Sequence, residues 1–142
     1  MLLTMSPAIC ALICFTLLTA ALGFAYPLQR IALVLTGKAS ADAWKRGAQT
    51  AAQPAWSVRV QNAHLNCLEN LPLFAAVIIA AYISDQLMVI EGLAMVYLAL
   101  RVAQSLVHVI SDSATFVFIR ANLWVPQMLI LFYWLLSLCG VF

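Results

Sequence analysis

Charged residues are scarce in this sequence, and their scarcity excludes a typical soluble domain. Aspartate, glutamate, lysine and arginine make up 8% of the 142 residues, whereas an average soluble domain has about 25%. The formal net charge at pH 7 is only +2, and no basic run is present, so nucleic acid is not an expected partner. With 65% hydrophobic residues, the composition indicates an integral membrane protein.

Several motifs of catalysis and metal binding are also absent. No Cys-x-x-Cys pair, glycine-rich phosphate loop or Gly-x-Ser-x-Gly motif occurs. The four cysteines all fall in apolar stretches, so we interpret them as small buried hydrophobes and expect neither disulfides nor a metal site. They are Cys10, Cys14, Cys67 and Cys139.

Four apolar stretches reach the length of about 20 residues that a helix needs to cross a bilayer. They cover residues 5–26, 65–84, 87–109 and 122–142. They predict an all-α fold, an integral membrane four-helix bundle that occupies residues 1–142 as a single domain, with a long loop at about 27–57. The first stretch lacks the charged n-region and the cleavage site of a signal peptide, so we expect it to persist as a helix.

Basic residues gather at one side of this predicted bundle, in or beside the first and third loops. They are Arg30, Lys38, Lys45, Arg46, Arg59, Arg101 and Arg120. The positive-inside tendency therefore predicts that these two loops are cytoplasmic and that both termini are non-cytoplasmic. The short loops and compact spans would suit a bacterial inner membrane.

The second apolar stretch is preceded and entered by many polar side chains, within RVQNAHLNCLENLPLF at residues 59–74. At about 3.6 residues per turn, five of these side chains share one face of a helix. They are Arg59, Asn62, Asn66, Glu69 and Asn70. Unpaired polar groups are costly in hydrocarbon, so this stripe is expected to face protein or a water-filled cavity.

The third apolar stretch carries a second polar face at a similar depth. Its members are Tyr97, Arg101, Gln104, Ser105, His108 and Asp112. Two stripes at one depth predict a shared site, and Arg101 is expected to pair across helices with a carboxylate such as Glu69. That pair could fix helix packing or support a ligand pocket. His108 could form an interhelical hydrogen bond or transfer a proton.

Simpler roles remain open for the other polar residues. Arg59 and Arg120 could anchor the chain at the membrane surface or bind anionic headgroups. Asn62 and Asn66 could join helices by hydrogen bonds, a common use of amides in membranes. His64 lies off the polar stripe and is interpreted as a structural or interfacial residue.

The segment at residues 59–74 resembles a signature of the MAPEG family, the membrane-associated proteins of eicosanoid and glutathione metabolism. That signature has the form R-x-x-R-A-x-x-N-x-x-E-x-x-P, and it is matched here by Arg59, Ala63, Asn66, Glu69 and Pro72. The run RVAQSLVH in the third stretch is similar to the family's second segment, in which a tyrosine follows an arginine on one face. The four-helix plan also agrees, so the resemblance spans the chain.

The resemblance implies a homotrimer that binds glutathione, as a thiol co-substrate, between neighbouring subunits near the cytoplasmic face. Arg59, Asn66, Glu69 and Arg101 would then bind or support glutathione, with Asn62 and Gln104 on the same two faces. Arg120 would activate the thiol, and His108 is a second candidate catalytic residue. The implied function is a glutathione-dependent membrane transferase or peroxidase acting on hydrophobic electrophiles, a detoxification chemistry.

Two positions depart from the family pattern and keep another function open. Asn62 stands where the signature has its second arginine, and His108 stands in place of the tyrosine. The alternative is therefore a catalytically silent membrane protein that binds a lipid or hydrophobic ligand between subunits. A transporter or channel is less favoured, because the polar groups gather near one face and do not line a path across the membrane.

Overall fold

Four long helices make up most of the chain in the computed structural model, which describes residues 5–45 and 48–141. They are α1 (Pro7–Leu35), α2 (Ala55–Ile83), α3 (Met88–Ile110) and α4 (Ala114–Leu138). Two short strands, β1 (Trp44–Lys45) and β2 (Ala48–Gln49), pair antiparallel in the loop between α1 and α2. Arg46, one of the basic residues assigned to that loop, lies outside the described residues.

Each of the four helices is long and apolar enough to cross a membrane. Their outer surfaces carry large exposed apolar side chains, such as Phe24 on α1 and Leu129 on α4, which suit contact with lipid and not with water. The prediction of a helical integral membrane protein with four spans is therefore confirmed.

Three helices extend beyond the apolar stretches that predicted them. α2 begins at Ala55, well before its apolar stretch. α1 continues through Pro27 to Leu35, and α4 begins at Ala114, so Arg120 lies within α4 and not before it. A charged residue marks the end of an apolar stretch that can lie in hydrocarbon. It does not end a helix, because backbone hydrogen bonds continue into the interfacial region.

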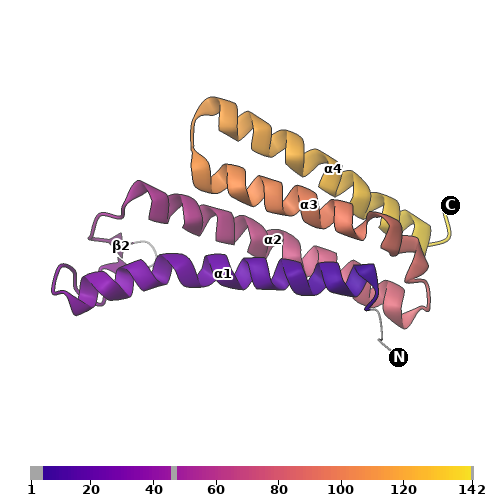
Figure 1. Cartoon of the computed structure of the whole chain (residues 1–142), viewed down its shortest axis with the longest axis horizontal. Coiled ribbons are helices and arrows are strands. Elements are labelled where there is room, and N and C mark those ends of the chain that lie inside the picture. Colours follow the sequence, from indigo (N-terminus) through magenta and orange to yellow (C-terminus); the bar gives the residue numbers. More distant parts are fainter. Residues whose placement is uncertain (1–4, 46–47, 142) are drawn as a thin grey trace.

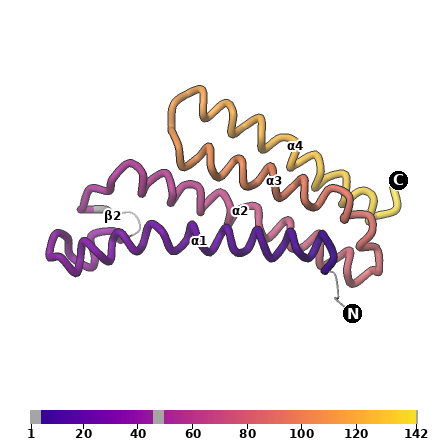
Figure 2. Tube along the Cα trace, viewed as in Figure 1, coloured from indigo at the N-terminus to yellow at the C-terminus, as the bar shows by residue number. Residues whose placement is uncertain are grey.

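The helices form an antiparallel arrangement in which α2 and α3 separate α1 from α4 (Figure 1). α1 packs against α2 and α3, and α4 packs mainly against α3. The start of α1, the α2–α3 turn and the end of α4 lie at one end of the bundle, as the trace in Figure 2 also shows. We call the opposite end, which carries the hairpin and the α3–α4 connection, the loop end.

The centre of the bundle is an aromatic cluster to which all four helices contribute. It consists of Phe15, Phe74, Tyr97 and Trp134, all fully buried. The Phe74 and Tyr97 rings stack with centroids 4.4 Å apart, while the other ring pairs of the cluster are tilted. Such contacts add to the area that the rings bury, and they hold α2 and α3 together below the polar residues.

Gly23 lets α1 approach α2 closely at the side chain of His64. The His64 Nδ1 lies 2.9 Å from the Thr19 carbonyl oxygen, and because a carbonyl only accepts, Nδ1 is the donor. The Tyr26 ring packs on the imidazole with centroids 5.8 Å apart. A Cβ atom at Gly23 would come within 2.7 Å of the imidazole Cε1. His64 therefore has the structural role expected of it.

We predict that Gly23→Ala destabilises the protein by about 1–3 kcal/mol, the usual cost of overfilling a packed site. The added methyl group must displace an imidazole that Thr19 and Tyr26 hold in place. Thermal unfolding of the detergent-purified protein measures the effect.

The matched control is Gly92→Ala in α3, where an added Cβ would meet nothing within 4 Å. This change should leave the stability unchanged or raise it slightly, because alanine restricts the unfolded chain. Equal unfolding temperatures for the two variants would contradict the close packing at Gly23.

Candidate functional site

A fully buried arginine joins the two polar faces that the sequence predicts. Arg101 is 0% exposed, and its Nη1 donates to the Asn66 side-chain oxygen over 2.6 Å. Its Cζ lies 5.4 Å from the centroid of the Phe15 ring, a cation–π distance. Its Nε and Nη2 are buried and have no hydrogen-bond partner among the described residues.

The predicted ion pair between Glu69 and Arg101 is wrong within the subunit. Among the residues that the structure describes, no ion pair joins them, and Glu69 is exposed on the surface of α2. The physical reason is helix rotation, since Asn66 faces α3 while a residue three positions later lies about 60° away from it around the helix axis, here on the exposed side. The amide of Asn66 therefore takes the position expected for the carboxylate.

A second polar cluster joins α3 to α4 around Arg120. The Arg120 Nη1 lies 2.8 Å from Nδ1 of His108 and 3.8 Å from a carboxylate oxygen of Asp112. Because a guanidinium can only donate, Nδ1 accepts and the proton of a neutral His108 ring is on Nε2. Gln104 donates to the Arg120 carbonyl over 3.2 Å, and Gln127 donates to the Gln104 side-chain oxygen over 3.1 Å.

These two clusters border one cavity, which we call the polar pocket. Its volume is about 330 Å³, and it is lined by Asn66, Gln104, His108, Val117, Arg120, Ala121 and Trp124. The pocket lies near the loop end, where α3 ends and α4 begins. Four of the eight predicted site residues therefore line one cavity, with contributions from α2, α3 and α4.

The other four predicted residues lie outside the pocket lining. Arg59 donates through Nε to the Val109 carbonyl over 2.8 Å, where it stabilises the carboxyl end of α3. Arg101 lies behind Asn66. Asn62 and Glu69 are exposed on α2.

Apart from the predicted Arg120, the residues of α4 are the part of the site that the sequence did not predict. Gln127 is fully buried and bonded to Gln104, and Trp124 lines the polar pocket. Trp124 follows Arg120 by four positions and Gln127 follows it by seven, which is helical spacing. That spacing was a usable signal, but it becomes informative only once Arg120 is known to lie inside a helix.

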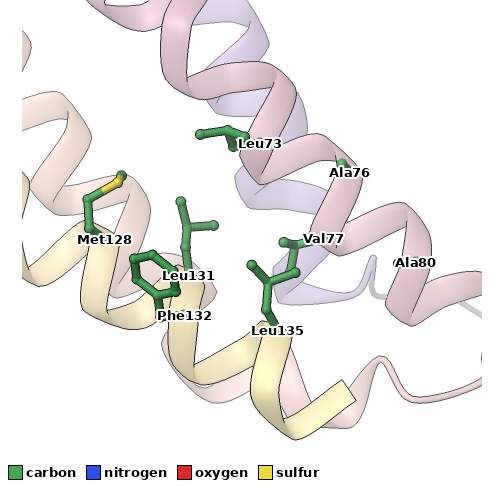
Figure 3. Close-up of a pocket in the computed structure, with 8 residues that line it drawn as sticks. All are labelled: Leu73, Ala76, Val77, Ala80, Met128, Leu131, Phe132 and Leu135. Atoms are coloured by element: carbon green, nitrogen blue, oxygen red, sulfur yellow. The ribbon is translucent and has the colours of Figure 1, made fainter. Parts of the chain in front are cut away.

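A second cavity, an apolar groove, lies between α2 and α4 (Figure 3). It has a volume of about 450 Å³ and is lined by Leu73, Ala76, Val77, Ala80, Met128, Leu131, Phe132 and Leu135. In α4 it begins at Met128, one turn after Trp124 of the polar pocket. A polar, cationic cavity and an apolar groove therefore follow one another along the same helix pair, a combination typical of sites for amphipathic or mixed ligands.

Comparison with known proteins identifies one relationship. The model of a protein family, described as the MAPEG family, matches residues 2–140 of the chain. None of the curated proteins and none of the solved structures that were compared matches the chain. The match includes every residue of the polar pocket and of the apolar groove.

We predict that Asn66→Ala lowers stability by about 1.5–3 kcal/mol, the usual contribution of a hydrogen bond to a charged group. The change removes the side-chain acceptor of the buried Arg101, which leaves its guanidinium without a hydrogen-bond partner among the described residues. Thermal unfolding without any ligand measures the loss.

The double variant Asn66→Leu with Arg101→Met should regain much of this stability, because replacing both partners by apolar residues removes the buried charge. Asn122→Ala serves as the control, since Asn122 is exposed and bonds only to a carbonyl of its own helix. If Asn66→Ala lowered the stability no more than Asn122→Ala, the hydrogen bond between Asn66 and Arg101 would not be an important support of the bundle.

Proposed function

Because the chain belongs to the MAPEG family, we propose that it is a glutathione-dependent membrane transferase or peroxidase that acts on hydrophobic electrophiles. Family membership places it among membrane proteins of glutathione and eicosanoid metabolism in general. The observation that carries the finer proposal is the polar pocket, where Arg120 lies 2.8 Å from His108. The apolar groove begins on α4 one turn after Trp124 of this pocket.

The donors around the polar pocket suit the anionic groups of glutathione, which has two carboxylates, one amine and a thiol. Asn66 accepts from Arg101 through its oxygen, so its NH₂ group remains to donate to a carboxylate. In this proposal Arg101 acts through Asn66, because its own guanidinium is buried. Arg59 keeps its two terminal nitrogens for a second carboxylate, since only its Nε bonds to Val109.

Arg120 is the proposed activator of the thiol. A free thiol with a pKa near 8.5 is mostly protonated at neutral pH, and a fixed cation beside the sulfur favours the thiolate. In the transferase reaction, a sulfur lone pair forms a bond to the electrophilic carbon, and the displaced electron pair leaves with the substrate's leaving group. The apolar groove would hold the hydrophobic part of that substrate next to the pocket.

The ammonium group of glutathione needs a carboxylate as its partner. The candidate is Glu69 of a neighbouring subunit. Asn62 and Glu69 are exposed on α2 within the apolar bundle, where polar groups facing lipid would be costly. We therefore propose the homotrimer that the family resemblance implies, with these side chains at the contact between subunits. The loop end would face the cytoplasm and both termini the other side, as in a bacterial inner membrane.

A catalytically silent protein that binds a lipid or hydrophobic ligand is the second candidate. It is favoured by the apolar groove of about 450 Å³ and by Asn62 in place of the signature's second arginine. Saturable lipid binding without thiol chemistry, unaffected by Arg120→Ala, would support it over the enzyme.

We predict that the detergent-purified protein binds glutathione and lowers the pKa of its thiol, and that Arg120→Ala abolishes this shift. Removing the cation moves thiolate formation to higher pH, so turnover at neutral pH should fall about 100-fold or more, as for other transition-state donors. Equilibrium binding and thiolate absorbance against pH measure both effects.

The control for this experiment is Lys38→Gln, which removes a cation of the loop that lies outside the polar pocket. It should leave the thiol titration unchanged. No binding of glutathione to the wild-type protein, or an equal effect of both substitutions, would refute the proposed role of Arg120.

We predict a particle mass of three times the 15.5 kDa chain, after correction for detergent, by native mass spectrometry. Glu69→Leu should keep the four-helix fold, because Glu69 is exposed and forms no ion pair with any residue that the structure describes. The same change should weaken glutathione binding, because it removes the carboxylate proposed for the amine. A monomeric wild-type protein would contradict a site shared between subunits.

A further inference from the structure

A third cavity lies at the loop end, between the last turns of α1 and the hairpin loop, away from the polar pocket. We call it the interfacial groove, and its volume is about 460 Å³. One part of its lining is apolar and the other carries two cations and an indole. The residues that matter here are Ile31, Val34 and Leu35 on one side, and Arg30, Trp44 and Lys45 on the other.

Arg30 is held in a defined position at the wall of this groove. Its Cζ lies 5.1 Å from the centroid of the Tyr26 ring and 5.7 Å from that of the Trp44 ring. Its Nη2 donates to the side-chain oxygen of Gln61 in α2 over 2.9 Å. The Gln53 side-chain oxygen, in the amide orientation that satisfies its hydrogen bonds, accepts from Nε and Nη2 over 2.6 Å. Two aromatic faces and two amides thus fix a guanidinium whose Nη1 is still available for an anion.

The groove lies where α1 leaves the hydrocarbon. α1 has 29 residues and is therefore about 43 Å long, whereas the hydrocarbon core is about 30 Å thick. Leu28, Ile31 and Leu35 are exposed along one face of its last turns, and such an apolar face suits contact with acyl chains. The cations and Trp44 lie beside that face, the arrangement typical of a membrane interface.

One acidic residue opposes the positive charge of the groove. Asp42 lies 3.1 Å from the Lys45 ammonium and accepts a hydrogen bond from Ser40 over 2.6 Å. The hydrogen bond from Ser40 and that from Lys45 hold the pKa of Asp42 below its ordinary value. The carboxylate is therefore charged at neutral pH and reduces the attraction that Lys45 exerts on an anion.

We propose that the interfacial groove binds one anionic phospholipid of the adjacent leaflet. The phosphate would lie against Arg30 and Lys45, and an acyl chain would follow Ile31 and Leu35 along α1. A soluble anion would use only the cations, while a zwitterionic lipid would bring its own positive charge to them. This site is separate from the polar pocket and does not depend on glutathione chemistry.

The test measures the binding of dioleoylphosphatidylglycerol to the detergent-purified protein by native mass spectrometry, with dioleoylphosphatidylcholine as the neutral comparison. The wild type should prefer the anionic lipid. Lys45→Gln should weaken its binding about fivefold, and Asp42→Asn should strengthen it by a similar factor, as expected for one charge near a membrane surface. Because the two variants act in opposite directions, a general loss of folding cannot produce both results.

Lys38→Gln is the matched control, since Lys38 is exposed in the same loop but does not line the groove. The affinity of this variant for the anionic lipid should stay within about twofold of the wild type. Equal binding of the two lipids, or unchanged affinity in both Lys45→Gln and Asp42→Asn, would overturn the proposal. So would displacement of the lipid by inorganic phosphate at an equal concentration, which would identify a soluble anion as the ligand.

Discussion

The burial of Arg101 is the constraint on which the arrangement of the bundle depends. A guanidinium with no exposed surface cannot give up its charge, so it must find compensation inside the protein. It finds an oxygen of Asn66 at 2.6 Å and the face of Phe15. These contacts set the rotation of α2 relative to α3 and bring Asn66 to the polar pocket. The same rotation turns Glu69 outward, and this outward carboxylate is the reason to look for the rest of the site on a second subunit.

Side-chain amides connect α3 to α4 by hydrogen bonds and add no further charge. Gln127 donates to Gln104, and Gln104 donates to the backbone of Arg120, which positions the α4 cation without a buried carboxylate. Such bonds suit a bilayer, because an amide is less costly to bury than an ion. The pocket can therefore hold its arginine near the membrane interface without a buried acidic residue beside it.

The sequence was sufficient to predict four spanning helices and to place Asn66, Gln104 and His108 on two polar faces at one depth, because helical periodicity and the cost of polar groups in lipid act on single segments. Arg120 was added only through the family resemblance. The sequence was not sufficient to identify the residue that hydrogen-bonds to Arg101. Complementary charge favoured Glu69, but the choice between residues 66 and 69 depends on the rotation of one helix against another, which only packing determines. The helix ends differed for a related reason, since Arg120 interrupts an apolar stretch without interrupting α4.

The contact between Arg120 and His108 limits how the proposed reaction can remove the thiol proton. Arg120 cannot accept it, because a guanidinium stays protonated. His108 Nδ1 already accepts from Arg120 at 2.8 Å, and Nε2 of the neutral ring carries a proton, so His108 could act as a base only after losing that contact. A mechanism that uses this geometry therefore releases the proton to water at the loop end and stabilises the thiolate by the charge of Arg120. In such a mechanism His108 is a positioning residue for Arg120, and the electrostatic field of one arginine supplies the activation.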